Sequence, residues 1–230
     1  MQGVRLPKGL ELVIFDCDGV LVDSEALAIR VYETLFDELG VRSPPGFWPQ
    51  CVGRKTSETL ALIGDSFGRD VMPELSAEIW PRMQAAFASE LKPTHGVTAF
   101  LEALQAPRCV ASSSDLERIR FSLEVAGISR FFGRRLYSSQ FVAKGKPAPA
   151  IVLYAAAEMG ANVRAALVIE DSTLGVTAAR AAGAKVIGFL GGGHVEPGHG
   201  ELLREAGADA VATSWAEVAN LFAHPESLGL

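Results

Sequence analysis

The chain has 230 residues, of which 49% are hydrophobic, and it carries a net charge of −6 with a pI near 5.3. This composition is typical of a globular protein and excludes a disordered chain, and the negative charge argues against broad binding to nucleic acid. The length allows one large domain, or a core with a smaller insertion. The three cysteines, Cys17, Cys51 and Cys109, have no metal-binding spacing, which fits a reduced protein in the cytoplasm.

The most apolar segment near the start of the chain is not a membrane or export signal. It runs from Leu10 to Val22, which is too short to cross a bilayer. It also contains Asp16 and Asp18, which make it a poor signal-peptide core. We therefore expect no membrane partner.

The first part of the chain predicts one strand followed by a helical block. The strand covers about Glu11–Phe15. A helix follows, for which Ser24 is the expected N-cap and Gly40 the stop. Further helical segments are predicted around residues 57–63 and 74–89, with no good strand between them.

Strands and helices alternate in the rest of the chain, after a predicted hinge at Lys92–Gly96. This alternation predicts an α/β fold with a mostly parallel sheet. We expect a Rossmann-like core formed by residues 1–22 and 92–230, with a helical cap domain of residues 23–91 inserted after the first strand. Such a cap could exclude water from a site at the sheet edge. The predicted elements of the second part are, in order, a helix at Val97–Gln105, a strand at Arg108–Ala111, a helix from Asp115 to Gly127, a strand at Leu136–Ser138, a helix starting within Pro147–Pro149, a strand at Ala166–Ile169, a helix ending at Gly183, a strand at Lys185–Phe189, a helix at Glu201–Ala206, a strand at Asp209–Ala212 and a final helix.

Polar residues follow several predicted strands where each strand ends. Because the carboxyl ends of parallel strands lie on one side of a sheet, we expect these residues to converge. Carboxylates are hard oxygen ligands suited to Mg²⁺, and a hydroxyl and a lysine suit phosphate oxygens. One carboxylate could then attack phosphorus while a neighbour acts as acid and base. The residues are Asp16 and Asp18 after the first strand, Ser112–Ser114 after the second, Lys146 before a helix, and Glu170 and Asp171 after the Ala166–Ile169 strand.

Four segments resemble, in order and spacing, the motifs of the haloacid dehalogenase superfamily. They are Asp16–Ser24, Ala111–Ser114, Gly145–Pro149 and Ile169–Ser172. The resemblance covers essentially the whole chain and is greatest for the capped phosphatases and phosphomutases related to β-phosphoglucomutase. It implies a fold and an activity of that kind.

The resemblance also implies catalytic roles for matching residues. Asp16 would be the nucleophile that forms an aspartyl-phosphate, and Asp18 the general acid and base. Ser112 would bind the transferring phosphoryl group, and Lys146 would neutralise that group and orient Asp16.

Metal-binding and substrate-binding roles follow from the same resemblance. Mg²⁺ would be held by Asp16, Asp171 and the backbone carbonyl of Asp18, with Glu170 helping directly or through water. The segment from Gly53 resembles a substrate-specificity loop of the cap. The residues expected to bind substrate are Gly53, Arg54, Lys55, Ser113 and Ser114.

One departure from the family pattern separates two activities. Sugar-phosphate mutases usually carry a histidine in the first cap helix, and the corresponding segment here reads Glu25-Ala26-Leu27-Ala28. We therefore expect a Mg²⁺-dependent phosphatase, acting as a monomer on a small phosphorylated metabolite, with a β-phosphoglucomutase-like phosphomutase as the alternative. Haloacid dehalogenation is disfavoured because it needs neither a metal nor an equivalent of Asp18. A phospho-accepting receiver is disfavoured because receivers are about half this length.

Other residues have simpler interpretations. Arg54 and Lys55 could equally be surface charges, and Cys17 is expected to point into the core. The glycines of Gly191–Gly193 are not followed by Lys-Ser/Thr, so they do not form a nucleotide-binding P-loop. The four histidines, which have no ligand spacing, are expected to be loop residues: His95, His194, His199 and His224.

Overall fold

A parallel sheet forms the centre of the computed structural model, which describes residues 3–68 and 72–229. The strand order is β3-β2-β1-β4-β5-β6, and all neighbouring pairs are parallel. This is the order of a Rossmann fold, so the predicted α/β class is confirmed. The strands are β1 (Leu12–Phe15), β2 (Arg108–Ser112), β3 (Leu136–Ser138), β4 (Ala166–Glu170), β5 (Lys185–Phe189) and β6 (Ala210–Ala212).

Helices cover both faces of this sheet, because its strands carry apolar side chains on both sides. In β1, Val13 and Phe15 belong to one buried cluster, whereas Leu12 and Ile14 belong to the other. The first cluster includes buried residues of α4 (Val97–Ala103), α5 (Leu116–Val125) and α9 (Trp215–Ala223). The second includes buried residues of α6 (Ala150–Glu158), α7 (Thr173–Ala182) and α8 (His199–Glu205).

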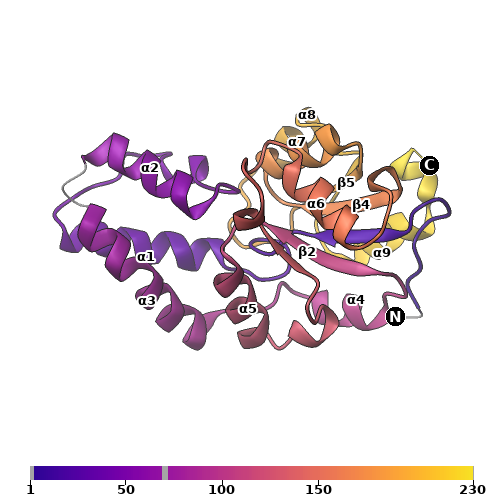
Figure 1. Cartoon of the computed structure of the whole chain (residues 1–230), viewed down its shortest axis with the longest axis horizontal. Coiled ribbons are helices and arrows are strands. Elements are labelled where there is room, and N and C mark those ends of the chain that lie inside the picture. Colours follow the sequence, from indigo (N-terminus) through magenta and orange to yellow (C-terminus); the bar gives the residue numbers. More distant parts are fainter. Residues whose placement is uncertain (1–2, 69–71, 230) are drawn as a thin grey trace.

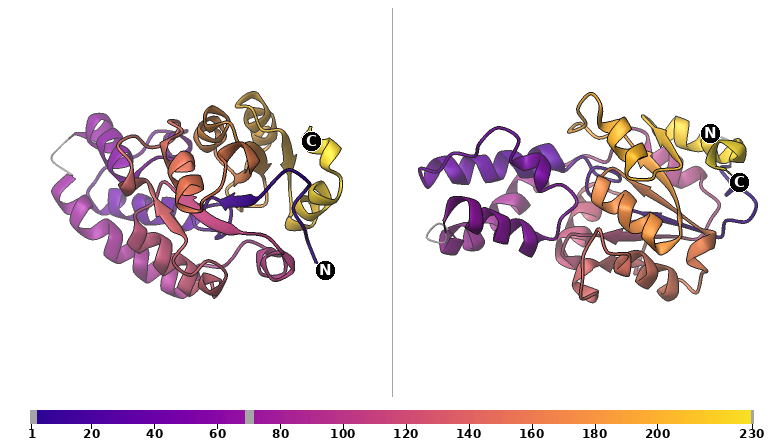
Figure 2. Two further views of the ribbon diagram at one scale, coloured as in Figure 1. Left: turned by 45° about the vertical axis from the view of Figure 1, so that its right-hand side comes forward. Right: turned by 90° about the horizontal axis from the view of Figure 1, so that it is seen from above.

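Three further helices form a separate group at one end of the molecule (Figures 1 and 2). They are α1 (Glu25–Glu38), α2 (Thr56–Phe67) and α3 (Met72–Glu90), and they lie in the sequence between β1 and β2. We call these helices and their connections the helical block. Its interior contains a cluster of aromatic rings, in which Phe36 packs against Trp48 and Phe67. Figure 1 shows this block on the side of the sheet away from both chain ends.

Most predicted boundaries agree closely with the observed elements, and the largest difference is in the helical block. The segment predicted around residues 57–63 extends over Thr56–Phe67. Its last turn contains Gly64, Asp65 and Ser66, which are poor signals for a helix. Cys17 is buried in the core, as predicted.

The structure bears on the membrane prediction in one respect. Within residues 3–68 and 72–229, none of the helices has both the length and the apolar character needed to cross a bilayer.

Candidate active site

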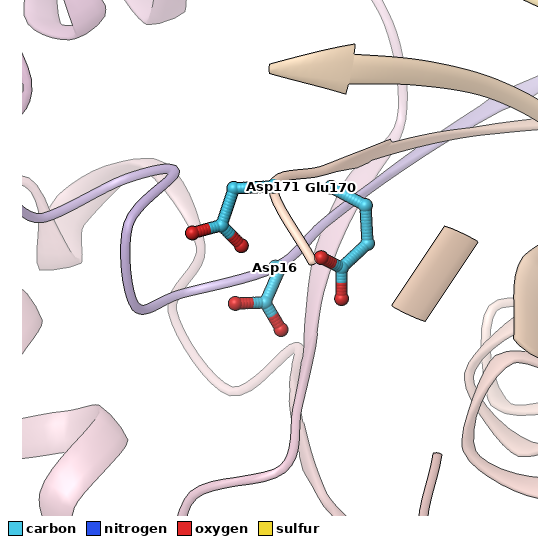
Figure 3. Close-up of side chains that lie close together, drawn as sticks. All are labelled: Asp16, Glu170 and Asp171. Atoms are coloured by element: carbon cyan, nitrogen blue, oxygen red, sulfur yellow. The ribbon is translucent and has the colours of Figure 1, made fainter. Parts of the chain in front are cut away.

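The carboxyl ends of β1 and β4 bring three carboxylates together (Figure 3). Asp16 directly follows β1, and its backbone N–H donates to the carbonyl of Ile169 at 3.0 Å. Glu170 is the last residue of β4, and Asp171 comes next. The chain runs from β1 to β2 and β3 on one side and then returns to β4 on the other side of β1. The strand order therefore reverses between β1 and β4, and such a switch point is where open α/β sheets bind ligands.

The three carboxylates form a compact buried group, which we call the acidic cluster. One ligand oxygen from each of Asp16, Glu170 and Asp171 lies within 4.8 Å of the others. Burial raises the pKa of Asp16 well above its usual range; Lys146 opposes this rise, and the neighbouring carboxylates add to it. Burial and then Glu170 also raise the pKa of Asp171. These shifts indicate a site that would gain stability from an added cation.

The donor set of the acidic cluster fits Mg²⁺. All of its side-chain donors are carboxylate oxygens, the ligand type that this ion prefers. The carboxylate of Asp18 is not part of the cluster, which is compatible with the expectation that this residue would contribute only its backbone carbonyl.

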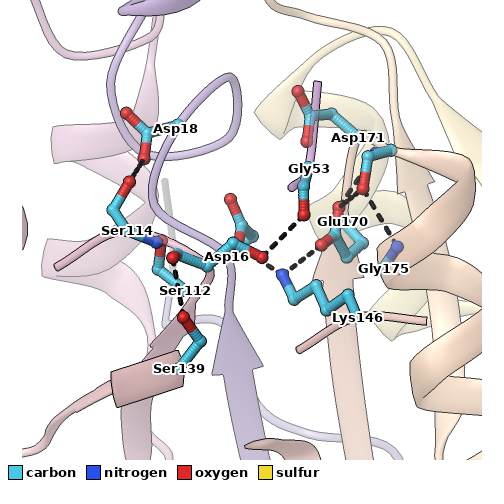
Figure 4. A network of polar contacts seen from close by, with 12 residues as sticks. Asp16, Asp18, Gly53, Ser112, Ser114, Ser139, Lys146, Glu170, Asp171 and Gly175 are labelled. Carbon is cyan, nitrogen blue, oxygen red and sulfur yellow. Dashed lines mark hydrogen bonds and ion pairs between the residues drawn. The ribbon is translucent and has the colours of Figure 1, made fainter. Parts of the chain in front are cut away.

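Lys146 lies between two members of the acidic cluster (Figure 4). Its Nζ atom donates to Asp16 Oδ1 at 2.5 Å and also to Glu170 Oε1. Burial would lower the pKa of Lys146, but the two carboxylates raise it above its usual value, so the ammonium group is charged. The other oxygen of Glu170 accepts hydrogen bonds from the N–H and the hydroxyl of Ser172. Glu170 therefore orients the lysine that contacts Asp16.

The three serines after β2 have different hydrogen-bond partners. Ser113 donates its hydroxyl to the carbonyl of Gly53 at 2.6 Å, which links the core to the helical block. Ser114 donates its hydroxyl to Asp18 Oδ2 at 2.6 Å (Figure 4). Ser112 Oγ accepts a hydrogen bond from the N–H of Ser114 at 3.1 Å. Within the described residues, the Ser112 hydroxyl donates no hydrogen bond. Of the three, Ser112 is therefore the one that can donate to a phosphoryl oxygen.

Two serines at the end of β3 support this loop and were not predicted. Ser138 donates its hydroxyl to the carbonyl of Ser114, and Ser139 donates to the carbonyl of Ser113, both at 2.7 Å. Nothing in the sequence distinguishes them from ordinary turn serines. Their role depends on the pairing of β3 with β2.

Asp18 accepts hydrogen bonds from three side chains, and one of these, Arg118, was not predicted from the sequence. Arg118 of α5 donates from its NH2 group to Asp18 Oδ1 at 2.7 Å, and the hydroxyl of Ser24 donates to the same oxygen at 2.6 Å. Burial would raise the pKa of Asp18, but Arg118 and the hydroxyls of Ser114 and Ser24 together lower it. Ser24 is the N-cap residue of α1, as predicted, but its hydroxyl bonds to Asp18 and does not cap the helix.

A cavity of about 650 Å³, part of it open to solvent, connects these groups with the helical block. On the core side its lining includes Asp16, Ser112 and Asp171. The opposite lining includes the residues Glu25, Ala28, Ile29, Tyr32, Trp48, Cys51, Arg54 and Thr59. A ligand held at Asp16 would therefore extend toward the helical block.

The expected substrate-binding residues of the Gly53 segment differ in position. Arg54 lines the cavity, and its Nε donates to the carbonyl of Gln50 at 2.7 Å. Lys55 is not among the lining residues, and its Nζ donates to the carbonyl of Val142 at 3.1 Å. Gly53 contributes its carbonyl to the contact with Ser113.

Two histidines lie beside the acidic cluster, where the sequence indicated only loop residues. His199 is the first residue of α8, so its assignment to a loop is wrong, and its Nε2 contacts the carbonyl oxygen of Asp171 at 2.6 Å. His194 does lie outside the helices and strands, and its Nε2 is 3.0 Å from Asp171 Oδ2. The spacing of these histidines in the sequence did not indicate that they approach Asp171. Their proximity to Asp171 depends on the pairing of β5 with β4.

The chain belongs to the haloacid dehalogenase-like hydrolase family, as its motifs predicted. The sequence profile of this family matches residues 13–189. A curated relative, 6-phosphogluconate phosphatase of Escherichia coli (strain K12), is 32% identical over 191 residues, which are 82% of this chain and 86% of that protein. The family and its phosphatase branch are therefore established.

Solved structures agree with this assignment. A conserved haloacid dehalogenase-like protein of unknown function from Agrobacterium tumefaciens is 32% identical, with a TM-score of 0.80, and the match covers 94% of this chain and 99% of that one. A haloacid dehalogenase family hydrolase from Deinococcus radiodurans R1, solved with bound phosphate and sodium, is 30% identical with a TM-score of 0.76. That match covers 95% of this chain and 97% of that one.

Proposed function

We propose that this protein is a Mg²⁺-dependent phosphatase that hydrolyses a small phosphorylated metabolite, a sugar phosphate or a similar compound, through an aspartyl-phosphate on Asp16. The observation that carries the proposal is the position of Asp16, which contacts Lys146, shares the acidic cluster with Asp171 and faces the same cavity as Ser112. A bound Mg²⁺, held by Asp16, Asp171 and the Asp18 carbonyl, would supply positive charge that lets a carboxylate approach a phosphate.

Asp16 is the group that would attack phosphorus. Lys146 occupies its Oδ1 atom, which leaves Oδ2 available as the nucleophile. The bond from Oδ2 to phosphorus would form as the bond from phosphorus to the leaving oxygen breaks. Ser112 would donate its hydroxyl to a phosphoryl oxygen, and the Lys146 ammonium would balance the charge. Water would then attack phosphorus and release inorganic phosphate and Asp16.

Asp18 would move the protons in both steps. It would donate a proton to the leaving oxygen and later accept one from the attacking water. Both of its oxygens are hydrogen-bonded to Arg118, Ser24 and Ser114 in this structure. Its action as an acid therefore requires a rearrangement that separates it from Arg118, a partner that favours its carboxylate form.

The walls of the cavity support a polar, anionic substrate of modest size. Arg54 and Arg118 provide positive charge, Glu25 can accept hydrogen bonds from hydroxyl groups, and Tyr32 and Trp48 provide apolar surface. The activity of the Escherichia coli relative on 6-phosphogluconate agrees with this class of substrate. Ala28 lines the cavity and brings no titratable group to it, which favours hydrolysis over the phosphomutase alternative.

The substrate class is tested by measuring phosphate release. We expect multiple turnovers with p-nitrophenyl phosphate and higher kcat/KM with one or more sugar phosphates or phosphorylated sugar acids, in the presence of Mg²⁺. Release that stops near one equivalent would indicate a phospho-accepting module instead. Isomer formation from a hexose 1-phosphate and its bisphosphate, without free phosphate, would support the phosphomutase.

The nucleophile is tested by Asp16→Asn. The amide cannot attack phosphorus, so kcat should fall by roughly 10³-fold or more, while circular dichroism shows an intact fold. Asp37→Asn changes an exposed aspartate of α1 and serves as the matched control. Substantial turnover by Asp16→Asn would disprove the assignment.

A further inference from the structure

The loop after β5 contacts both the first motif and Asp171. The N–H of Gly193 donates to Asp23 Oδ1 at 2.9 Å. Where the loop ends, His199, the first residue of α8, contacts the carbonyl oxygen of Asp171 through its Nε2. The loop is therefore fixed on one side to the segment after Asp18 and on the other to the acidic cluster. The proposed reaction assigns no role to its glycines or its histidines.

His194 lies within this loop, and its side chain approaches a carboxylate of the acidic cluster. Its side chain is 8% exposed, and its Nε2 lies 3.0 Å from Asp171 Oδ2. The two atoms are not aligned as a hydrogen bond: both ring nitrogens of His194, and Asp171 Oδ2, have no hydrogen-bond partner among residues 3–68 and 72–229. Buried polar atoms without partners are rare in native proteins and require an explanation.

The His194 ring and the Asp171 carboxylate pack against the backbone of glycines, which have no side chain. A Cβ atom at Gly19, whose φ is +73°, would lie 1.8 Å from Asp171 Oδ2 and 2.8 Å from His194 Cε1. A Cβ atom at Gly192 would lie 2.8 Å from Nδ1 and Cε1 of the His194 ring. Side chains at either position would therefore displace the ring from the carboxylate. Gly192 in this loop and Gly19 in the first motif therefore have a steric reason that involves the site.

We propose that His194 is a positioning residue for Asp171, and that it orients this carboxylate for the divalent cation of the proposed function. A small turn of either side chain would align a ring N–H with Asp171 Oδ2, which would direct the other carboxylate oxygen to the cation. Hydrogen bonds from such outer groups to ligating carboxylates typically change metal affinity 10-fold to 100-fold. The inference rests on the Mg²⁺ site and extends it to the loop after β5.

The test is a calorimetric titration of the EDTA-treated protein with Mg²⁺. His194→Leu removes the donor and keeps much of the volume, so we expect the Kd for Mg²⁺ to rise about 10-fold to 100-fold. His194→Gln keeps an N–H donor and should restore part of this loss.

The controls separate positioning from folding. His224→Leu alters a histidine whose Nδ1 contacts the carbonyl of Asn220, away from the acidic cluster, and should leave the Kd unchanged. Gly192→Ala keeps the imidazole but displaces it, and it should weaken Mg²⁺ binding even if His194→Leu does not fold. The Tm of each metal-free variant shows whether it is folded.

The outcomes are distinguishable from a failure of the proposed function. A wild-type protein that binds no Mg²⁺ would refute the metal dependence and this inference together. A wild type that binds Mg²⁺, with a Kd unchanged within twofold in folded His194→Leu or Gly192→Ala, would refute only the role of His194.

Discussion

At Asp18, three neighbours determine the charge state of one carboxylate. Ser24 and Ser114 donate hydroxyl hydrogen bonds, and Arg118 adds a full positive charge, so the carboxylate is favoured despite burial. A general acid works best when its pKa is near the working pH. The contact with Arg118 therefore opposes the protonated form that the proposed reaction needs.

Replacement of Arg118 by glutamine should change the pH profile and the stability together. The pKa of Asp18 should rise, because the positive charge that lowers it is lost. If protonated Asp18 is the general acid, the alkaline limb of the pH profile of kcat/KM should move to higher pH. Removing one member of a buried pair also costs about 3 kcal/mol of folding free energy, which thermal unfolding would detect.

A double-mutant cycle provides the control for this prediction. Adding Asp18→Asn to Arg118→Gln should cost much less stability than the two single changes summed, because the charges depend on each other. Additive losses, or an unchanged pH profile in Arg118→Gln, would contradict the role given to this pair.

At the scale of elements, a few polar contacts connect the helical block to the core. Ser113 donates to the carbonyl of Gly53, and Lys55 donates to the carbonyl of Val142. Trp80 of α3 donates its indole N–H to Glu117 of α5. The cavity lies between the elements that these contacts join, so its shape depends on them.

Lys55→Met tests whether Lys55 positions the helical block or binds the substrate directly. Loss of its hydrogen bond to Val142 should weaken the docking of the helical block on the core by about 1 kcal/mol. If the block must be docked to bind substrate, KM should rise roughly fivefold. The rise should be equal for substrates with neutral and with acidic tails. Lys144→Met, at an exposed lysine, is the matched control. A loss confined to acidic substrates would instead show a direct contact with the substrate's charge.

For the whole molecule, the acidic cluster links folding stability to pH and to metal. Burial raises the pKa values of Asp16 and Asp171 well above their unfolded values, so without metal the folded state binds more protons than the unfolded chain. The contribution of these two groups to the free energy of unfolding is therefore most favourable below a pH of about 4. It is lost as pH rises through the raised pKa values. Asp18, whose pKa is lowered, contributes in the opposite direction.

Mg²⁺ should cancel the loss caused by the acidic cluster. It binds the deprotonated carboxylates, so the difference in Tm between Mg²⁺-containing and EDTA-containing samples should grow as pH rises from about 4.5 to 8. At one hundred times its Kd the ion would add about 3 kcal/mol, and each kcal/mol raises the Tm of a domain of this size by roughly 2–4 °C. Asp171→Asn should abolish most of this difference. A Tm that is independent of Mg²⁺ at every pH would contradict the metal site.

Much of the site could be predicted because its residues follow strands. Asp16, Ser112 and Glu170 are next to buried apolar runs, and a parallel sheet places the carboxyl ends of such runs together. The same rule did not reveal Arg118 or Ser139. Arg118 is one of several charges on α5 and Ser139 one of many turn serines, and neither has a local pattern that separates it from solvent-facing residues.

The α/β architecture, the family and the groups that gather at the sheet edge could all be predicted from the amino-acid sequence. These follow from local periodicity and from motif order, which are properties of the chain before it folds. Three contacts became visible only in the folded molecule: Arg118 with Asp18 Oδ1, Lys55 with the carbonyl of Val142, and His194 with Asp171. Such contacts join residues far apart in the chain, and their geometry depends on how helices and loops pack across the sheet.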